Sequence, residues 1–359
     1  MSTHTKKILN GYHVVFLAQS AMIGSGILTL PRELSSVGYS QTFLPILFGV
    51  FASLTLWPMV WLNLKYPNEN LFRINEILLG KGLGKILNVL IILQFTLFIA
   101  GIINKYMHLI QSTALPEQTI TKPVLLFLLL LIYIVNGGIK SIARFCMLTF
   151  FLTIGIFYFT YWAVQKGDFS HLFPLFNFNG KELFEAMGKG YLAVLGYGAI
   201  MFYFPYIVDQ KKAFKHVLTG IWISISLCFI TVLISVMYFS EWQLKHIEFS
   251  ILNLLKSGEL SFVERFDIIG VTLWVFLILT TVAVYLWSAK EGIVSLFSKE
   301  KKYYIYVLTA IVFLIVRIPF PQEFQDKFFT TVNYIAYFLI VWPSFLSIIY
   351  LLRKKQVQP

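Results

Sequence analysis

The stretch at residues 22–31, MIGSGILTLP, decides the fold, because its two glycines interrupt an apolar segment near the N-terminus. That segment, about 12–32, is long enough to cross a bilayer, which needs about 20 apolar helical residues. Glycine lets a helix unwind, yet lipid offers no hydrogen bonds to unwound backbone. The stretch therefore predicts a broken transmembrane helix whose freed backbone groups are satisfied by protein, water or a ligand.

The rest of the chain has the composition of a membrane protein. Of its 359 residues 58% are hydrophobic and only 13% are charged, about half the charged share of a soluble domain. Nine further apolar segments follow, at about 41–64, 86–111, 123–139, 143–166, 187–208, 214–239, 262–289, 303–320 and 328–352. We therefore expect an all-α integral membrane protein with ten transmembrane helices in a single polytopic domain, residues 1–359.

The net charge of +12 indicates membrane topology rather than nucleic-acid binding, since Lys and Arg lie between the apolar segments. With the N-terminus in the cytoplasm, one side of the membrane holds 18 of the 29 Lys and Arg and 5 of the 17 Asp and Glu. The net charges are then +13 on that side and −1 on the other. This asymmetry predicts that both termini are cytoplasmic.

The cysteines, histidines and carboxylates of the sequence do not have the spacing of a catalytic or metal-binding site. Cys146 and Cys228 lie in apolar segments, and no His, Cys or carboxylate cluster has the spacing of metal ligands. Phosphate-loop, nucleophile-elbow and His-Glu-x-x-His motifs are lacking. We expect no enzyme activity, no cofactor and no structural metal. The eight tryptophans, Trp274 among them, are interpreted as an interfacial belt.

A second glycine pair lies in the sixth segment, where LGYGAI spans residues 195–200, 172 residues after the first pair. Two amphipathic stretches, 70–85 and 242–264, also occupy matching places, each after the second helix of its half. Five helices in each half make the halves opposite in orientation. These features predict an inverted five-plus-five repeat, with halves of about 12–166 and 187–352 and a binding site between broken helices one and six.

These motifs resemble those of the amino acid–polyamine–organocation permeases and, among them, the B subunit of spore germinant receptors. The resemblance extends from the 22–31 motif through Tyr66-Pro67 and the YFPY run at 203–206 to a brief basic tail. It implies a LeuT-like fold in the spore inner membrane, with A and C receptor subunits as partners. It further implies that the protein senses a small germinant, usually an amino acid, and triggers ion release.

The same resemblance indicates where the ligand binds. It implies a pocket between helices one, three, six and eight. Helix three offers Gln94, Thr96 and Phe98 as further candidates without showing which face is inward. Thr280 and Thr281 stand where sodium-coupled relatives of the fold place hydroxyl ligands. The residues expected to bind the ligand are Gly24, Ser25, Gly26, Leu97, Gly101, Leu195, Gly196, Tyr197, Gly198, Thr281 and Tyr285.

Two other functions remain open at this level: an amino-acid permease working by alternating access, and a subunit of a ligand-gated ion channel. A proton-driven transporter needs a group that titrates near the membrane midplane. The central thirds of the ten segments contain no Asp, Glu, Lys or His. This composition favours a sensor over a proton-coupled permease.

Overall fold

A computed structural model describes residues 7–114, 119–173, 176–258, 265–318 and 321–357 of the chain. Within these ranges the protein is built from helices, and the only extended pairing is a single parallel bridge between Leu9 and Ile207. The helices are α1 (Gly11–Met22), α2 (Gly26–Glu33), η1 (Ser35–Phe43), α3 (Leu44–Lys65), α4 (Leu71–Leu79), α5 (Lys81–Thr113), α6 (Thr121–Asn136), α7 (Gly138–Thr153), η2 (Ile154–Thr160), α8 (Tyr161–Lys166), η3 (Phe169–Leu172), α9 (Gly180–Gly190), η4 (Tyr191–Ala199), α10 (Ile200–Tyr203), η5 (Phe204–Tyr206), η6 (Gln210–Lys212), α11 (Ala213–Tyr238), α12 (Glu241–His246), α13 (Ser250–Leu255), α14 (Phe266–Phe297), α15 (Tyr303–Arg317) and α16 (Gln322–Val357).

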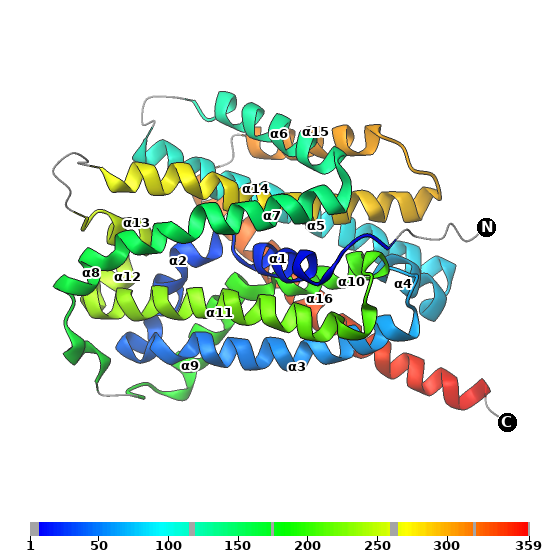
Figure 1. The fold of residues 1–359 in the computed structure, drawn as a ribbon, viewed down its shortest axis with the longest axis horizontal. Coiled ribbons are helices and arrows are strands. Elements are labelled where there is room, and N and C mark those ends of the chain that lie inside the picture. The colour runs from blue at the N-terminus through cyan, green and yellow to red at the C-terminus, as the bar shows by residue number, and fades with distance from the viewer. Residues whose placement is uncertain (1–6, 115–118, 174–175, 259–264, 319–320, 358–359) are drawn as a thin grey trace.

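The long helices lie side by side along the longest axis of the molecule (Figure 1). In the described ranges six helical runs are long and apolar enough to span a membrane, and the bent pair α1–α2 makes a seventh. The shorter apolar helices α6 and α15 correspond to two more predicted spans. The predicted sixth span is divided among α9, η4, α10 and η5. The all-helical membrane fold is confirmed, while the count of ten stays a prediction.

Several predicted boundaries were wrong. Helix α5 begins at Lys81, five residues before the predicted start, because Gly80 adopts a positive φ of 85° and lets α4 turn directly into α5. Helix α14 continues to Phe297, eight residues past its predicted end. It does so because Lys290 is only 8% exposed and is paired with Glu291, so this charge does not end the helix.

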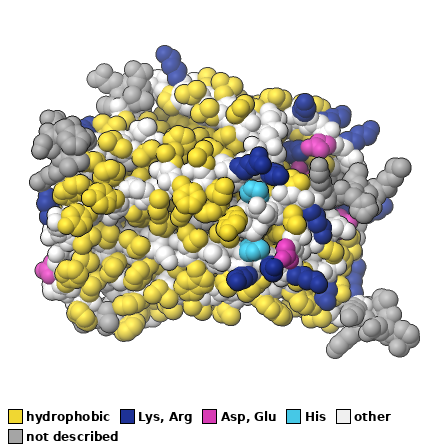
Figure 2. Space-filling model, in the orientation of Figure 1, with side chains coloured by type: hydrophobic (Ala, Val, Ile, Leu, Met, Phe, Trp, Pro, Cys, Tyr) yellow, Lys and Arg dark blue, Asp and Glu magenta, His cyan; other side chains and the backbone are white. Residues whose placement is uncertain are grey.

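One end of the bundle carries most of the basic side chains, and we call it the basic end. Hydrogen bonds join its parts: Val208 N donates to Leu9 O at 2.9 Å, and Gln210 Nε2 donates to Pro67 O at 2.6 Å. Both ends of the chain lie on this side in Figure 1, and Figure 2 shows Lys and Arg side chains gathered there. This distribution agrees with the charge asymmetry expected from the sequence.

The two amphipathic stretches pack on protein at opposite ends. At the basic end, the Asn75 side chain of α4 donates to Asn88 Oδ1 of α5 and accepts from Trp342 Nε1 of α16, both at 2.9 Å. At the other end α13 buries Leu252 and Leu255 against α2 and α14. Each stretch therefore covers the bundle that holds the helix breaks.

Candidate functional site

The predicted break of the first transmembrane helix lies between α1 and α2, whose axes are bent by 52°. Ile23 has extended backbone angles, φ −88° and ψ 91°, so the helical hydrogen-bond pattern stops there. Carbonyl groups in the last turn of a helix lack helical donors. The interruption at residues 23–25 therefore leaves backbone oxygens in the middle of the bundle that need partners.

Helix α14 supplies those partners from the other half of the chain. The Thr281 hydroxyl lies 2.7 Å from Ser20 O and 2.9 Å from Ile23 O, and the Trp274 indole N–H donates to Gly24 O at 3.3 Å. Both side chains are buried. Because a hydroxyl has one proton, Thr281 donates to one of its carbonyls at a time. The break is thus stabilised by a side-chain cluster rather than by lipid or solvent.

The two neighbouring threonines of α14 differ in what they contact. Thr280 Oγ1 donates to Leu277 O of its own helix at 2.8 Å. Thr281 Oγ1 lies 3.0 Å from the same carbonyl and also reaches the break. Of the two threonines, only Thr281 therefore links α14 to helix one through a side-chain hydrogen bond.

Trp274 corrects an interpretation made from the sequence. Its side chain is 1% exposed and points to the helix break, so its assignment to an interfacial belt was wrong. The belt was suggested by the eight tryptophans together, most of which lie toward segment ends, whereas Trp274 lies near the middle of the predicted segment 262–289. The Trp274 indole is buried because Gly24 O needs a hydrogen-bond donor that the interrupted helix does not supply.

The glycines of both motifs permit the two broken helices to touch. A Cβ on Gly196 would lie 1.9 Å from Ala21 O, and one on Gly26 would lie 2.7 Å from Ala193 Cα. Both are contacts with backbone atoms, which move only if a helix moves. Gly26 and Gly196, one glycine of each pair, are therefore required for the close packing of helix one on helix six.

The second break is a 3₁₀ stretch, η4, rather than an open loop. Leu195, Gly196 and Gly198 face the inside of the bundle, whereas Tyr197 faces α3. The Tyr197 hydroxyl lies 2.6 Å from Thr55 Oγ1. Of the four residues expected at this break, three lie together and Tyr197 lies apart.

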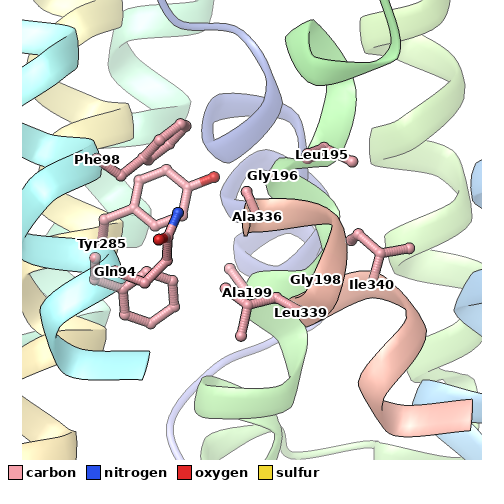
Figure 3. Close-up of a pocket in the computed structure, with 11 residues that line it drawn as sticks. Gln94, Phe98, Leu195, Gly196, Gly198, Ala199, Tyr285, Ala336, Leu339 and Ile340 are labelled. Carbon is pink, nitrogen blue, oxygen red and sulfur yellow. The ribbon is translucent and has the colours of Figure 1, made fainter. Parts of the chain in front are cut away.

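A small cavity of about 30 Å³ lies between η4 and α5, α14 and α16 (Figure 3). Such a volume has room for one or two water molecules. Its lining comes from Gln94, Phe95 and Phe98 of α5, Leu195, Gly196, Gly198 and Ala199 at the second break, Tyr285 of α14, and Ala336, Leu339 and Ile340 of α16. The cavity has no charged side chain in its wall.

Two polar side chains interrupt this apolar wall. The Tyr285 hydroxyl points across the cavity toward Gly196 in Figure 3, and no side chain or backbone group in the described ranges forms a hydrogen bond with it. The Gln94 amide donates to Val332 O of α16 at 2.6 Å. The Tyr285 hydroxyl is therefore a polar group of this wall that is available to a ligand.

The structure places the two residues chosen on helix three away from this cavity. Leu97 is half-buried and does not line it. Gly101 faces α16, where an added Cβ would lie 2.9 Å from the Phe329 ring. Gln94 and Phe98, named as candidates without a choice of face, line it together with Phe95. No role for α16 was predicted, although this helix closes one side.

Contacts at the basic end join the start of helix one to the sixth span and to α14. Ile8 N and Leu9 N both donate to Tyr206 O, at 2.8 and 3.0 Å, so the chain before α1 is tied to the end of the sixth span. The Tyr206 hydroxyl donates to Glu291 Oε2 at 3.1 Å, and Lys290 Nζ lies 3.1 Å from Glu291 Oε1. Together with the packing of α13 at the other end, these contacts hold helix one in the bundle on both sides of its break.

Comparison with known proteins identifies similar sequences along nearly the whole chain. A family model described as spore germination protein matches residues 8–325. Spore germination protein GerQB of Bacillus cereus is 25% identical over 305 residues, covering 85% of this chain and 84% of that protein. Spore germination protein B2 of Bacillus subtilis (strain 168) is 27% identical over 354 residues, covering 95% of each.

Solved transporters share the fold. Mhp1, a nucleobase-cation-symport-1 family transporter in a closed conformation with bromovinylhydantoin bound, superposes with a TM-score of 0.67 at 14% identity and covers 94% of this chain and 79% of its own. MhsT in complex with L-phenylalanine gives a TM-score of 0.62 at 16% identity, covering 94% and 87%. At these identities the likeness establishes the LeuT fold and nothing about ligands.

Proposed function

The chain belongs to the spore germination protein family, and on that basis we propose that it is the membrane subunit of a germinant receptor that binds a small germinant between its two helix breaks. The observation that carries the proposal is the cavity between η4, α5, α14 and α16, with the Tyr285 hydroxyl directed into it. Binding there would shift the bundle between two conformations and pass the change to other subunits.

An amino acid suits the chemistry of this region. The start of α2 presents backbone N–H groups that attract a carboxylate. The surrounding wall is apolar and suits an apolar side chain. The present cavity of about 30 Å³ is smaller than any amino acid. Ligand binding therefore requires that α16 or α5 move away from η4.

Replacing Tyr285 by phenylalanine is expected to weaken germinant binding about ten-fold while leaving the melting temperature unchanged. The change removes one hydroxyl that faces the cavity and has no protein partner in the described ranges, and such a bond to ligand contributes about 1 kcal/mol or more. Dose–response curves of spore germination, together with a check that the protein is present, measure the effect. Tyr133→Phe, on a side chain 81% exposed, is the control. A wild-type dose response for Tyr285→Phe would argue against this site.

The oxygen atoms around Thr281 also suit a sodium ion. Three carbonyl oxygens, those of Ser20, Ile23 and Leu277, lie within 3.0 Å of the Thr281 hydroxyl, with the Thr280 hydroxyl on the same turn. Hard cations prefer such oxygen ligands. We expect germinant affinity to be at least several-fold higher in sodium chloride than in potassium chloride if the ion binds here. Equal affinities in the two salts would contradict a sodium site.

We also propose, from the family, that A and C receptor subunits are partners, that the site of action is the spore inner membrane, and that both termini are cytoplasmic. Binding would then lead to ion release from the spore. Co-purification of tagged chain with A and C subunits tests the complex. Labelling of single cysteines at residue 7 and residue 357 with an impermeant reagent tests the orientation, since neither should react from outside sealed membranes.

An amino-acid permease is the second candidate, because both solved neighbours are transporters. A permease must expose its cavity to each side in turn. Uptake of labelled amino acid into proteoliposomes decides between the two. A sensor is expected to bind ligand without accumulating it. Conductance that requires the other subunits would instead indicate a channel component.

A further inference from the structure

Two cations lie unneutralised where α7 begins beside α1. Lys140 and Arg144 are near enough to His13 of α1 for their charges to act on its imidazole. Arg144 is exposed and Lys140 is half-buried. In the described part of the chain neither forms an ion pair with Asp or Glu. This place therefore presents an uncompensated positive charge at the foot of broken helix one.

The same surface continues directly into apolar side chains. Arg144, Leu148 and Phe151 are spaced four and three residues apart, so they share one face of α7. Leu148 is 63% exposed and Phe151 is 65% exposed. The Phe151 ring also lies 5.7 Å, centroid to centroid, from the ring of Phe16 on α1. The cations thus lie at the end of an exposed apolar strip on α7, and the far end of this strip packs against the buried Phe16 of α1.

Figure 2 shows this arrangement on the face that carries α1. Lys and Arg side chains lie on both sides of two histidines, and hydrophobic side chains extend away from them along the bundle. On the α11 side, His216 packs on Gly11, where an added Cβ would lie 2.7 Å from Nε2, and Lys215 next to it is exposed. The start of α1 is therefore flanked by positive charge from two helices.

We propose that the α1–α7 junction at the basic end binds an anionic phospholipid, with Lys140 and Arg144 holding its phosphate and Leu148 and Phe151 contacting an acyl chain. Cations that continue into a lipid-facing strip match a molecule that is anionic at one end and apolar at the other. An acidic protein segment would leave the strip unexplained. Because Phe151 packs on Phe16, a lipid bound along α7 also stabilises α1 in its packed position, and this consequence does not depend on the ligand cavity.

The test is lipid binding to the purified full chain, measured by native mass spectrometry with dioleoylphosphatidylglycerol and, for comparison, zwitterionic dioleoylphosphatidylcholine. Each removed cation is expected to weaken binding of the anionic lipid about five-fold, so Lys140→Gln with Arg144→Gln should weaken it about 25-fold. The control is Lys299→Gln with Lys302→Gln, which removes the same charge from exposed positions in another loop of the basic end. Its affinity for the anionic lipid should stay at the wild-type value.

A second readout follows α1 itself. Hydrogen exchange within Gly11–Met22 should slow when phosphatidylglycerol is added to the wild type or the control, and should not slow in the Lys140/Arg144 variant. Inorganic phosphate at the same concentration should reproduce neither effect. The proposal is overturned if the Lys140/Arg144 variant binds phosphatidylglycerol as tightly as wild type, if both variants lose binding equally, or if phosphatidylcholine or inorganic phosphate acts as well as the anionic lipid.

Discussion

Alanine at position 196 is expected to abolish the germinant response and to lower the free energy of unfolding by about 3 kcal/mol, the upper part of the usual range for overpacking. The added methyl group would lie 1.9 Å from Ala21 O, inside the contact distance of any atom pair. A backbone carbonyl cannot rotate away as a side chain does. Helix six must therefore separate from helix one, and the cavity beside the second break, which Gly196 itself lines, loses its shape.

The measurements for this variant are the melting temperature of the purified protein and germination of spores that contain it. Gly188→Ala is the matched control, because a Cβ at that helical glycine meets no atom within 4 Å. The control should be as stable as wild type or slightly more so, since alanine favours helix. Wild-type stability and response in Gly196→Ala would contradict the close packing described above.

Valine at position 281 is expected to reduce the germinant response ten-fold or more and to destabilise the protein by about 1–3 kcal/mol. The change keeps the shape of the side chain but removes its hydroxyl. Ser20 O and Ile23 O, both buried at the break, then lose their common donor. An unpaired buried carbonyl retains its full desolvation cost, so the break would be stabilised less and α1 would be held less firmly.

Two further variants locate the cause. Thr281→Ser keeps the hydroxyl and should restore most of the response. Thr280→Val removes a hydroxyl that donates only to Leu277 O of its own helix. If these hydroxyls act only as hydrogen-bond donors, this variant should have a nearly wild-type germinant response. If Thr280→Val is as damaging as Thr281→Val, and sodium raises germinant affinity, both hydroxyls coordinate the ion. A wild-type response in Thr281→Val would show that its bonds to helix one are dispensable.

The helix breaks and the membrane-spanning character were predictable because both depend on residues that are close together in the sequence. Gly24 and Gly26 interrupt one apolar segment, and Gly196 and Gly198 interrupt another. Unwinding depends on these residues and their immediate neighbours. The structure accordingly breaks helix one at residues 23–25 and turns helix six into a 3₁₀ stretch at the second pair.

The faces of the helices were less predictable. Helix α5 is apolar on nearly all sides, since one face meets lipid and the other meets protein, so hydropathy does not distinguish Gln94 and Phe98 from Leu97 and Gly101. At the second break, a 3₁₀ helix advances each residue by 120° rather than 100°. In this stretch Gly196 lines the cavity and Tyr197 faces α3. The sequence alone does not predict the 3₁₀ rotation that separates them.

The sequence by itself determined that the chain is an all-helical membrane protein, basic at one end, with two helices broken at glycines. The tertiary structure alone decided which side chains surround the breaks. The reason is separation along the chain: Thr281 reaches Ser20 across 261 residues, and Trp274 reaches Gly24 across 250. Hydropathy and glycine spacing are local properties of the sequence, whereas these hydrogen-bond partners depend on how distant helices pack. The same packing places α16 in the wall of the cavity, which no local sequence pattern predicted.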